Sequence, residues 1–236
     1  MKKLLVFLLA ITTCIVITGC IKDKPEQKKK KEPAVGSWQT VFNNNDIYID
    51  EEAKTVFENA KKDYTTMELE VIELLAKQVV SGQNYMFLAK GYTKGEEDKA
   101  TYKIVVVYKN LENKSTITKV SNFDYTKYVN ENIKNPNETL DGGWSVESPG
   151  KPIMLDEQLQ AAFDNATNKL TGVNYSPITL LGTQLVSGTN YAILCYGKST
   201  DENAKEAIYL LTLYEDLNGT QEIVSQAYID LADYNK

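Results

Sequence analysis

The chain repeats itself once, and this duplication is the feature that most limits how it can fold. Residues of the first half recur in the second at a constant offset of 106 positions, from Trp38 and Trp144 to Asp124 and Asp230, without a gap. A unit of roughly a hundred residues is long enough to bury a core. Two copies are too few for a solenoid. The sequence therefore predicts two tandem domains, at residues 36–135 and 142–236.

Each unit opens with a short extended piece around its tryptophan and continues into one helix. Asp50 is suited to cap the helix, and Glu51 and Glu52 suit its positive end. Apolar residues follow at helical spacing and form one face in each copy. They are Ala53, Val56, Phe57, Ala60 and Tyr64 in the first, and Leu159, Ala162, Phe163, Ala166 and Leu170 in the second.

Runs rich in apolar, aromatic and β-branched residues follow the helix and predict four strands. In the first copy they span 69–80, 85–92, 100–108 and 116–123, with turns at 81–84 and 110–115. Short polar turns between such runs are typical of hairpins. Consecutive antiparallel strands with one amphipathic helix predict an α+β unit, in which the apolar face of the sheet packs on the helix.

The N-terminus is typical of an export signal. Lys2 and Lys3 precede an apolar run at 4–16, which is too short for a comfortable membrane span. The following Ile17-Thr18-Gly19-Cys20 resembles the lipobox of bacterial lipoproteins. The resemblance implies that residues 1–19 are a signal peptide and that Cys20 carries a diacylglyceryl anchor on the outer face of the cell membrane. An ordinary export signal with a chance cysteine is the alternative.

Residues 20–35 are predicted to form a flexible linker behind that anchor. The segment contains Pro25, Pro33 and the run Lys28–Lys31, with almost nothing to bury. Such a composition favours an extended, solvated tether. The lysine run is also suited to rest on anionic lipid or cell-wall polymer.

Composition argues against several classes of function. The chain has no histidine and no arginine, and its 26 lysines are outnumbered by 32 acidic residues. An acidic surface without arginine argues against nucleic acid as a partner. Without histidine there is no Ser-His or Cys-His nucleophile pair and no histidine zinc ligand. We therefore expect no enzyme activity, cofactor or metal. Only Cys195 remains for the mature fold, where it is expected to be a small buried hydrophobe.

One motif occurs in the first predicted hairpin of both copies. It is Gln78-Val79-Val80-Ser81-Gly82 in the first and Gln184-Leu185-Val186-Ser187-Gly188 in the second. Together with Gly36 and Gly142 ahead of the helices, this resembles the Gln-x-Val-x-Gly motif and the N-terminal glycine of the cystatins. The resemblance implies two cystatin-like domains, each an antiparallel sheet of about four to five strands wrapped on one helix.

The same resemblance implies binding, and inhibition, of papain-family cysteine proteases by a wedge built from the N-terminal segment and both hairpin tips. The predicted contacts are Gly36, Gln78, Val79, Val80, Ser81, Gly82, Leu111, Gly142, Gln184, Leu185, Val186, Ser187, Gly188 and Leu217. Inhibitory cystatins usually carry Pro-Trp in the second hairpin, where this chain has Leu111 and Leu217. Two alternatives stay open. The first is that the motif serves turn geometry alone and makes no contact with a partner. The second is that the chain is a non-inhibitory binding module for an envelope protein, a peptide or a cell-wall polymer.

Overall fold

The computed structural model describes residues 36–41, 49–129, 143–146, 155–201 and 205–235. The predicted signal peptide, Cys20, the linker and Gly142 lie outside these residues. Pro33–Lys236 forms one compact unit. None of the helices in the described part of the chain combines the length and the apolar character needed to cross a membrane.

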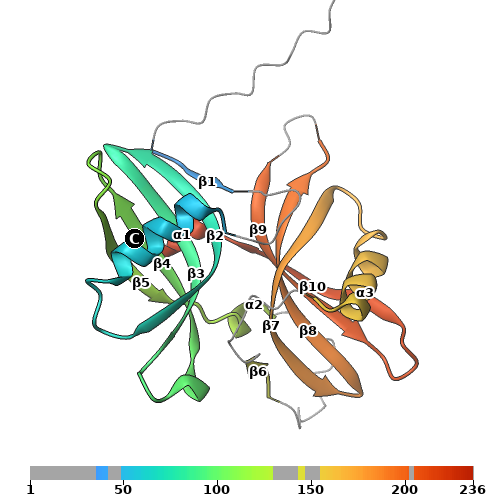
Figure 1. Cartoon of the computed structure of the whole chain (residues 1–236). Coiled ribbons are helices and arrows are strands. Elements are labelled where there is room, and N and C mark those ends of the chain that lie inside the picture. Colours follow the sequence, from blue (N-terminus) through green and yellow to red (C-terminus); the bar gives the residue numbers. More distant parts are fainter. Residues whose placement is uncertain (1–35, 42–48, 130–142, 147–154, 202–204, 236) are drawn as a thin grey trace, which may run out of the picture. The chain divides into compact units, whose positions relative to one another are not determined.

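The two repeats have the same order of elements (Figure 1). The first contains β1 (Trp38–Thr40), α1 (Glu51–Lys61), β2 (Glu68–Val80), β3 (Gly82–Tyr92), β4 (Thr101–Lys109) and β5 (Ser115–Asn122). The second contains β6 (Ser145–Val146), α3 (Glu157–Thr167), β7 (Val173–Val186), β8 (Gly188–Ser199), β9 (Glu206–Glu215) and β10 (Gln221–Ile229). A short helix, α2 (Thr126–Val129), follows the first repeat.

Each repeat builds one antiparallel sheet whose strands are neighbours in chain order. The orders are β1-β2-β3-β4-β5 and β10-β9-β8-β7-β6, and β6 contributes only two residues. The strands β2 to β5 and β7 to β10 follow one another through turns or short loops, as antiparallel pairing permits, whereas α1 lies between β1 and β2 and α3 lies between β6 and β7. The predicted α+β class, with antiparallel sheets and few helices, is confirmed.

The helices begin where the sequence predicts. The side chain of Asp50 accepts a hydrogen bond from the Ala53 amide at 2.6 Å, and Asp156 accepts one from Leu159 at 2.8 Å. Both are N-caps that satisfy a free helical N–H group. The helices end at Lys61 and Thr167, so the inclusion of Tyr64 and Leu170 on the helical faces was wrong.

The first hairpin turn is tighter than predicted. Val80 pairs with Gly82, so Ser81 alone forms the tip and residues 82–84 belong to β3. A φ of +120° at Gly82 allows this reversal, because a side chain is strained in that conformation. The predicted turn at 81–84 was therefore too long.

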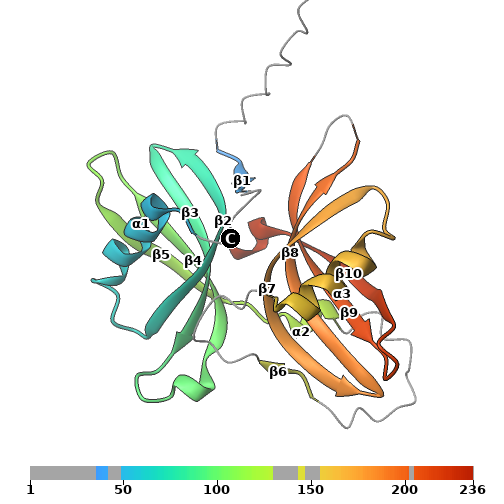
Figure 2. The same cartoon turned by 45° about the vertical axis from the view of Figure 1, so that its right-hand side comes forward.

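Both faces of each sheet are buried, which gives the molecule four layers (Figures 1 and 2). Val105 and Val107 on β4 pack with α1, whereas Ile104 and Val106 belong to a core that includes side chains of both sheets. The second sheet divides its side chains in the same way between α3 and this shared core. The uninterrupted apolar run at 104–107 follows from burial on both faces.

Two tyrosine hydroxyl groups cross between the sheets. Tyr102 donates a hydrogen bond to the backbone oxygen of Leu181 at 2.9 Å, and Tyr196 donates one to Leu74 at 2.7 Å. Both carbonyl groups lie where the pairing register shifts, at Leu180/Gly182 and Leu74/Ala76. Bulges interrupt the ladder of backbone hydrogen bonds. The tyrosines thus supply polar partners inside an otherwise apolar interface.

Candidate functional site

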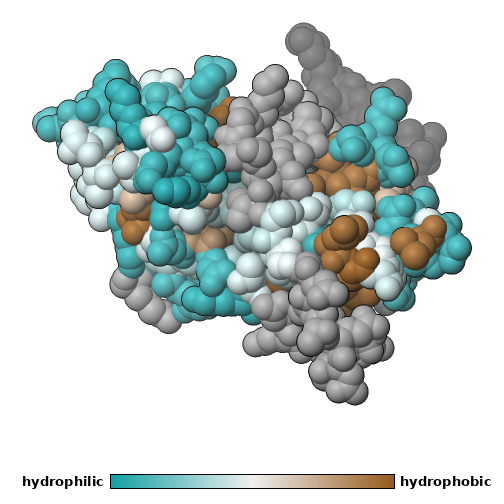
Figure 3. All heavy atoms as spheres, turned by 90° about the horizontal axis from the view of Figure 1, so that it is seen from below, coloured by the Kyte–Doolittle hydropathy of each residue, from teal (hydrophilic) through white to brown (hydrophobic). Residues whose placement is uncertain are grey.

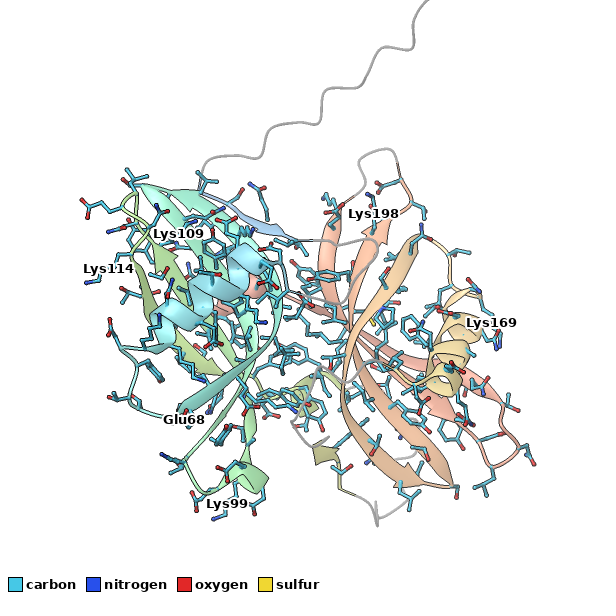
Figure 4. The ribbon with its side chains drawn as sticks, in the orientation of Figure 1. Glu68, Lys99, Lys109, Lys114, Lys169 and Lys198 are labelled. Carbon is cyan, nitrogen blue, oxygen red and sulfur yellow. The ribbon has the colours of Figure 1, made fainter. Side chains whose placement is uncertain are left out.

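In each repeat the N-terminal segment and both hairpin turns meet at one end of the sheet. Trp38 pairs with Gln78, and Gln83 pairs with Lys109, so β1 and the second turn lie beside the first turn. We call Gly36, residues 79–82 and residues 110–114 the first hairpin end. Lys109 and Lys114 lie at this end in Figure 4, and Lys99 lies at the opposite end of the same sheet.

The second sheet has an equivalent end. Ser145 pairs with Thr183, and Thr189 pairs with Glu215. We call Gly143, residues 185–188 and residues 216–220 the second hairpin end. Gly142 lies just outside the described residues, and its neighbour Gly143 is exposed. The register therefore brings together the predicted contact residues of each repeat, apart from Gly142.

The glutamine of the motif holds the first hairpin end together. The side-chain amide of Gln78 donates to the backbone oxygen of Gly36 at 2.9 Å, and its own oxygen accepts from Asn84 at 2.7 Å. In the second repeat Asn190 donates to Gln184 at 2.9 Å, and both side chains are buried. These glutamines position the chain around the turn, and their side chains are not presented as free contacts.

The motif glycine makes room for a tyrosine of the same repeat. A Cβ atom at Gly82 would lie 2.5 Å from the backbone oxygen of Lys109 and 2.8 Å from the Tyr108 ring. Tyr108 donates a hydrogen bond to the carbonyl group of Ser81, and Tyr214 does the same to Ser187 beside Gly188. The cystatin resemblance assigns these glycines to protease approach. In this chain the group that approaches them is the chain's own tyrosine.

Aliphatic side chains project from both hairpin ends. Val79, Val80 and Leu111 are 49%, 38% and 82% exposed. In the second repeat Leu185 and Leu217 are 74% and 84% exposed, and Ser81 and Ser187 are exposed at the tips. Figure 3, seen from below, shows apolar surface among polar neighbours, and this view looks away from the end of the first sheet where Lys109 and Lys114 lie in Figure 4. Of the predicted contacts that the structure describes, these residues and Gly36 are the exposed ones.

Polar side chains order the second turn of each end. The oxygen of Asn110 accepts from the amides of Glu112 and Lys114 at 3.0 and 2.9 Å. The carboxylate of Asp216 accepts hydrogen bonds from the backbone amides of Asn218 and Thr220 at 2.8 Å each. These bonds lower the pKa of Asp216, and the one from Thr220 has the largest effect. Such side-chain turns fix the backbone locally. Leu111 and Leu217, next to these capping residues, therefore project from turns that are already ordered.

A pocket that was not predicted lies at the opposite end of the first sheet. It has a volume of about 400 Å³ and is lined by Thr101, Tyr102, Lys103, Asn122, Phe123, Asp124, Tyr125 and Thr126. Lys103 lies almost buried there and donates to Asn122, and burial lowers the pKa of its amino group. Lys103 precedes the apolar run 104–107 in β4, and a lysine at the start of such a buried run was the available signal. Asn122 lies in the mostly polar β5 and gave no such signal.

The remaining candidates behave as packing groups. Cys195 is fully buried among the α3-side residues, and burial raises the pKa of its thiol. Trp38 and Trp144 are partly buried and pack against the shared core. Among the described residues, no cluster of acidic or cysteine side chains has the makings of a metal site. Comparisons of this chain with protein-family models and with curated proteins give no match.

Proposed function

We propose that the chain is a lipid-anchored protein on the outer face of the cell membrane that binds papain-family cysteine proteases and blocks them through its hairpin ends. The observation that carries this proposal is the meeting of three segments at one end of each sheet. An N-terminal segment and two hairpin turns lie side by side there, with aliphatic side chains exposed. A protease cleft needs a narrow, apolar and ordered insert of this kind.

The arrangement of each repeat supports a cystatin-like fold as part of the proposal. A short strand, a helix and four strands follow one another, and the sheet order equals the chain order. The Gln-x-Val-x-Gly motif occupies the first hairpin turn, where the resemblance expects it. Two independent features, element order and motif position, therefore agree in both repeats.

The physical basis of binding is apolar burial by pre-ordered turns. Fully burying a leucine or valine side chain yields about 1.5–3 kcal/mol. The turn at 110–114 is fixed by Asn110, and the tip at Ser81 by Tyr108. Less conformational entropy is then lost when the ends dock. A wedge that offers no correctly placed scissile bond blocks a protease without being cut.

A second candidate function is favoured by the second turn. Leu111 and Leu217 occupy positions where inhibitory cystatins usually carry an aromatic anchor, and large aromatic residues often dominate interface energies. The same ends would then bind an envelope protein, a peptide or a cell-wall polymer without inhibiting a protease.

A titration of papain activity with residues 33–236 separates the two functions. We expect inhibition, and we expect Val79→Ser, Val80→Ser, Leu111→Ser, Leu185→Ser and Leu217→Ser together to weaken it at least about tenfold. These side chains are exposed, so the melting temperature should hold. Substitutions of Gly82 or Gly188 are unsuitable for this test, because any side chain there would be strained and would clash with neighbouring atoms. Tyr228→Ser, at an exposed site far along β10, is the matched control.

Papain left fully active by saturating protein would contradict the inhibitor proposal and favour the envelope module. Inhibition unchanged in the five-residue variant would contradict the role of the hairpin ends. The anchor has a separate test by membrane fractionation. Cys20→Ser should release the protein from membranes or leave its precursor unprocessed, because both acyl chains of a diacylglyceryl anchor are attached through the thiol of this cysteine.

A further inference from the structure

In the first repeat, the amino groups of two lysines lie over the ring of Tyr85. The amino groups of Lys77 and Lys109 lie 5.2 and 5.6 Å from the centre of the Tyr85 ring. Lys109 also pairs with Glu52 at 2.5 Å, and Lys77 pairs with Asp50 at 3.4 Å. The two ion pairs balance the charges of these lysines and carboxylates beside the start of α1.

The second repeat keeps the tyrosine and lacks both lysines. At the offset of 106 residues, Tyr191 replaces Tyr85, Thr183 replaces Lys77, and Glu215 replaces Lys109. Asp156 is retained in the place of Asp50. Tyr191 pairs with Thr183 and with Leu213, and Glu215 lies two residues after Leu213 on β9, so strand alternation puts Thr183, Tyr191 and Glu215 on one face of the sheet. Burial raises the pKa of Tyr191, and the charges of Glu215 and Asp156 raise it further.

No ion pair among the described residues reaches Glu215 or Asp156. Asp156 is engaged in capping α3, and Glu215 is half-buried at the end of β9. The second repeat therefore keeps the aromatic ring and the aspartate of the first, has Gln158 in the place of Glu52, and carries the carboxylate of Glu215 where the first repeat has a lysine. Among its described residues, no lysine takes the place of Lys77 or Lys109. A cation from another molecule fits the same geometry.

Exposed leucines border this place. Leu185 lies two residues after Thr183 on β7, and alternation along a strand puts both on one face of the sheet. Leu217 follows Glu215 in the adjacent turn. The surface therefore combines aliphatic contact with unbalanced negative charge, whereas the first hairpin end combines it with charges that are already paired.

We propose that the second hairpin end is a docking surface for a protein segment in which lysine or arginine lies next to an apolar residue. The partner's cation occupies the place over Tyr191 that Lys77 and Lys109 fill in the first repeat. Its apolar neighbour contacts Leu185 and Leu217. This inference rests on the proposed function in that the hairpin ends are the binding surfaces, and it names the chemistry that the second end selects.

The test is an NMR titration of residues 33–236 with the peptide acetyl-Leu-Lys-Leu-Lys-Leu-amide. We expect the methyl signals of Leu185 and Leu217 to shift and those of Val79 and Leu111 to stay. The matching peptide with glutamate in place of lysine should cause no shift. Raising the salt concentration from about 0.05 to 0.5 M should weaken binding, since screening shortens the reach of charges.

Two reciprocal variants make the test specific. Thr183→Lys with Glu215→Lys gives the second end the lysines of the first, and it should lower peptide affinity at least about tenfold. Lys77→Thr with Lys109→Glu makes the opposite exchange, and it should create peptide shifts at Val79. Melting temperatures of both variants check that the fold is retained.

Absence of peptide shifts at Leu185, equal shifts at both ends, or binding that survives Glu215→Lys would overturn the inference. Its failure is distinguishable from failure of the proposed function, because papain is titrated separately. Papain inhibition without peptide selectivity would leave the protease proposal standing alone. Peptide selectivity without papain inhibition would support the docking surface and contradict the protease proposal.

Discussion

At the scale of the residue, the motif glycines and the tyrosines beside them form one device. Gly82 and Gly188 share a φ of +120°, and a Cβ atom at either would collide with a backbone oxygen and a tyrosine ring. The tyrosine hydroxyl groups then bond the carbonyl groups of Ser81 and Ser187. The tight turn and the tyrosine hydrogen bond that stabilises it therefore both require glycine at this position.

This device predicts unequal effects of two alanine substitutions. Gly82→Ala should lower the free energy of unfolding by about 3 kcal/mol, since backbone strain adds to a steric clash. Gly95 also has a positive φ, of +87°, but open space around it. Gly95→Ala should therefore cost only about 1 kcal/mol. Urea denaturation measures both, and equal losses would contradict the internal role of Gly82.

Glu73 predicts how stability depends on pH. Burial raises the pKa of its carboxyl group to about 7, from an ordinary value of 4.5. Between these values the folded state holds a proton that the unfolded state has released, so stability falls as pH rises through that interval and then levels off. The loss amounts to about 3 kcal/mol at most. In Glu73→Gln, urea denaturation across pH 4–8 should lack this component; an unchanged slope would contradict the assignment.

At the scale of the element, Gln78 links three segments of the first hairpin end. Its amide bonds Gly36, and its oxygen accepts from Asn84. Gln78→Ala removes both bonds and should free the N-terminal segment from β2. Hydrogen–deuterium exchange should quicken at the Gly36 and Val41 amides, which donate to the carbonyl groups of Val79 and Leu75, while the amide of buried Val105 keeps its rate. Uniform acceleration would instead indicate global destabilisation, and no change would deny the link.

The element order and the helix starts were predictable because their signals are local. Asp50 and Asp156 precede helical spacing directly, and turn-forming residues separate the strand runs. The shared core was not predicted. A short apolar run such as 104–107 fits several buried environments, and periodicity alone does not say what covers the second face.

The candidate site was predictable in outline only. The motif pointed to the right turn, yet it did not reveal which of its side chains face inward. Gln184 is buried against Asn190, whereas its neighbour Leu185 projects into solvent. That distinction follows from strand alternation and from a register that only the paired strands define. The contrast between Lys109 and Glu215 was not predicted, because the sequence alone does not show that the amino group of Lys109 lies over the Tyr85 ring.

At the scale of the whole molecule, the repeats share a core through the inner faces of their sheets. Tyr102 and Tyr196 add hydrogen bonds across it. Calorimetry of residues 33–236 should therefore show one cooperative transition, because unfolding one repeat exposes the inner face of the other. Residues 36–135 alone should aggregate or associate through that face. Two separate transitions, or a stable monomeric half, would contradict this coupling.

The central claim is that the hairpin ends are the surfaces that meet a protease. Hydrogen–deuterium exchange on residues 33–236, free and bound to inactivated papain, locates that surface directly. The account predicts protection at residues 79–82 and 110–114, at 185–188 and 216–220, or at one of these two sets. Protection confined to the pocket around Lys103, or to the far ends of the sheets, would contradict it.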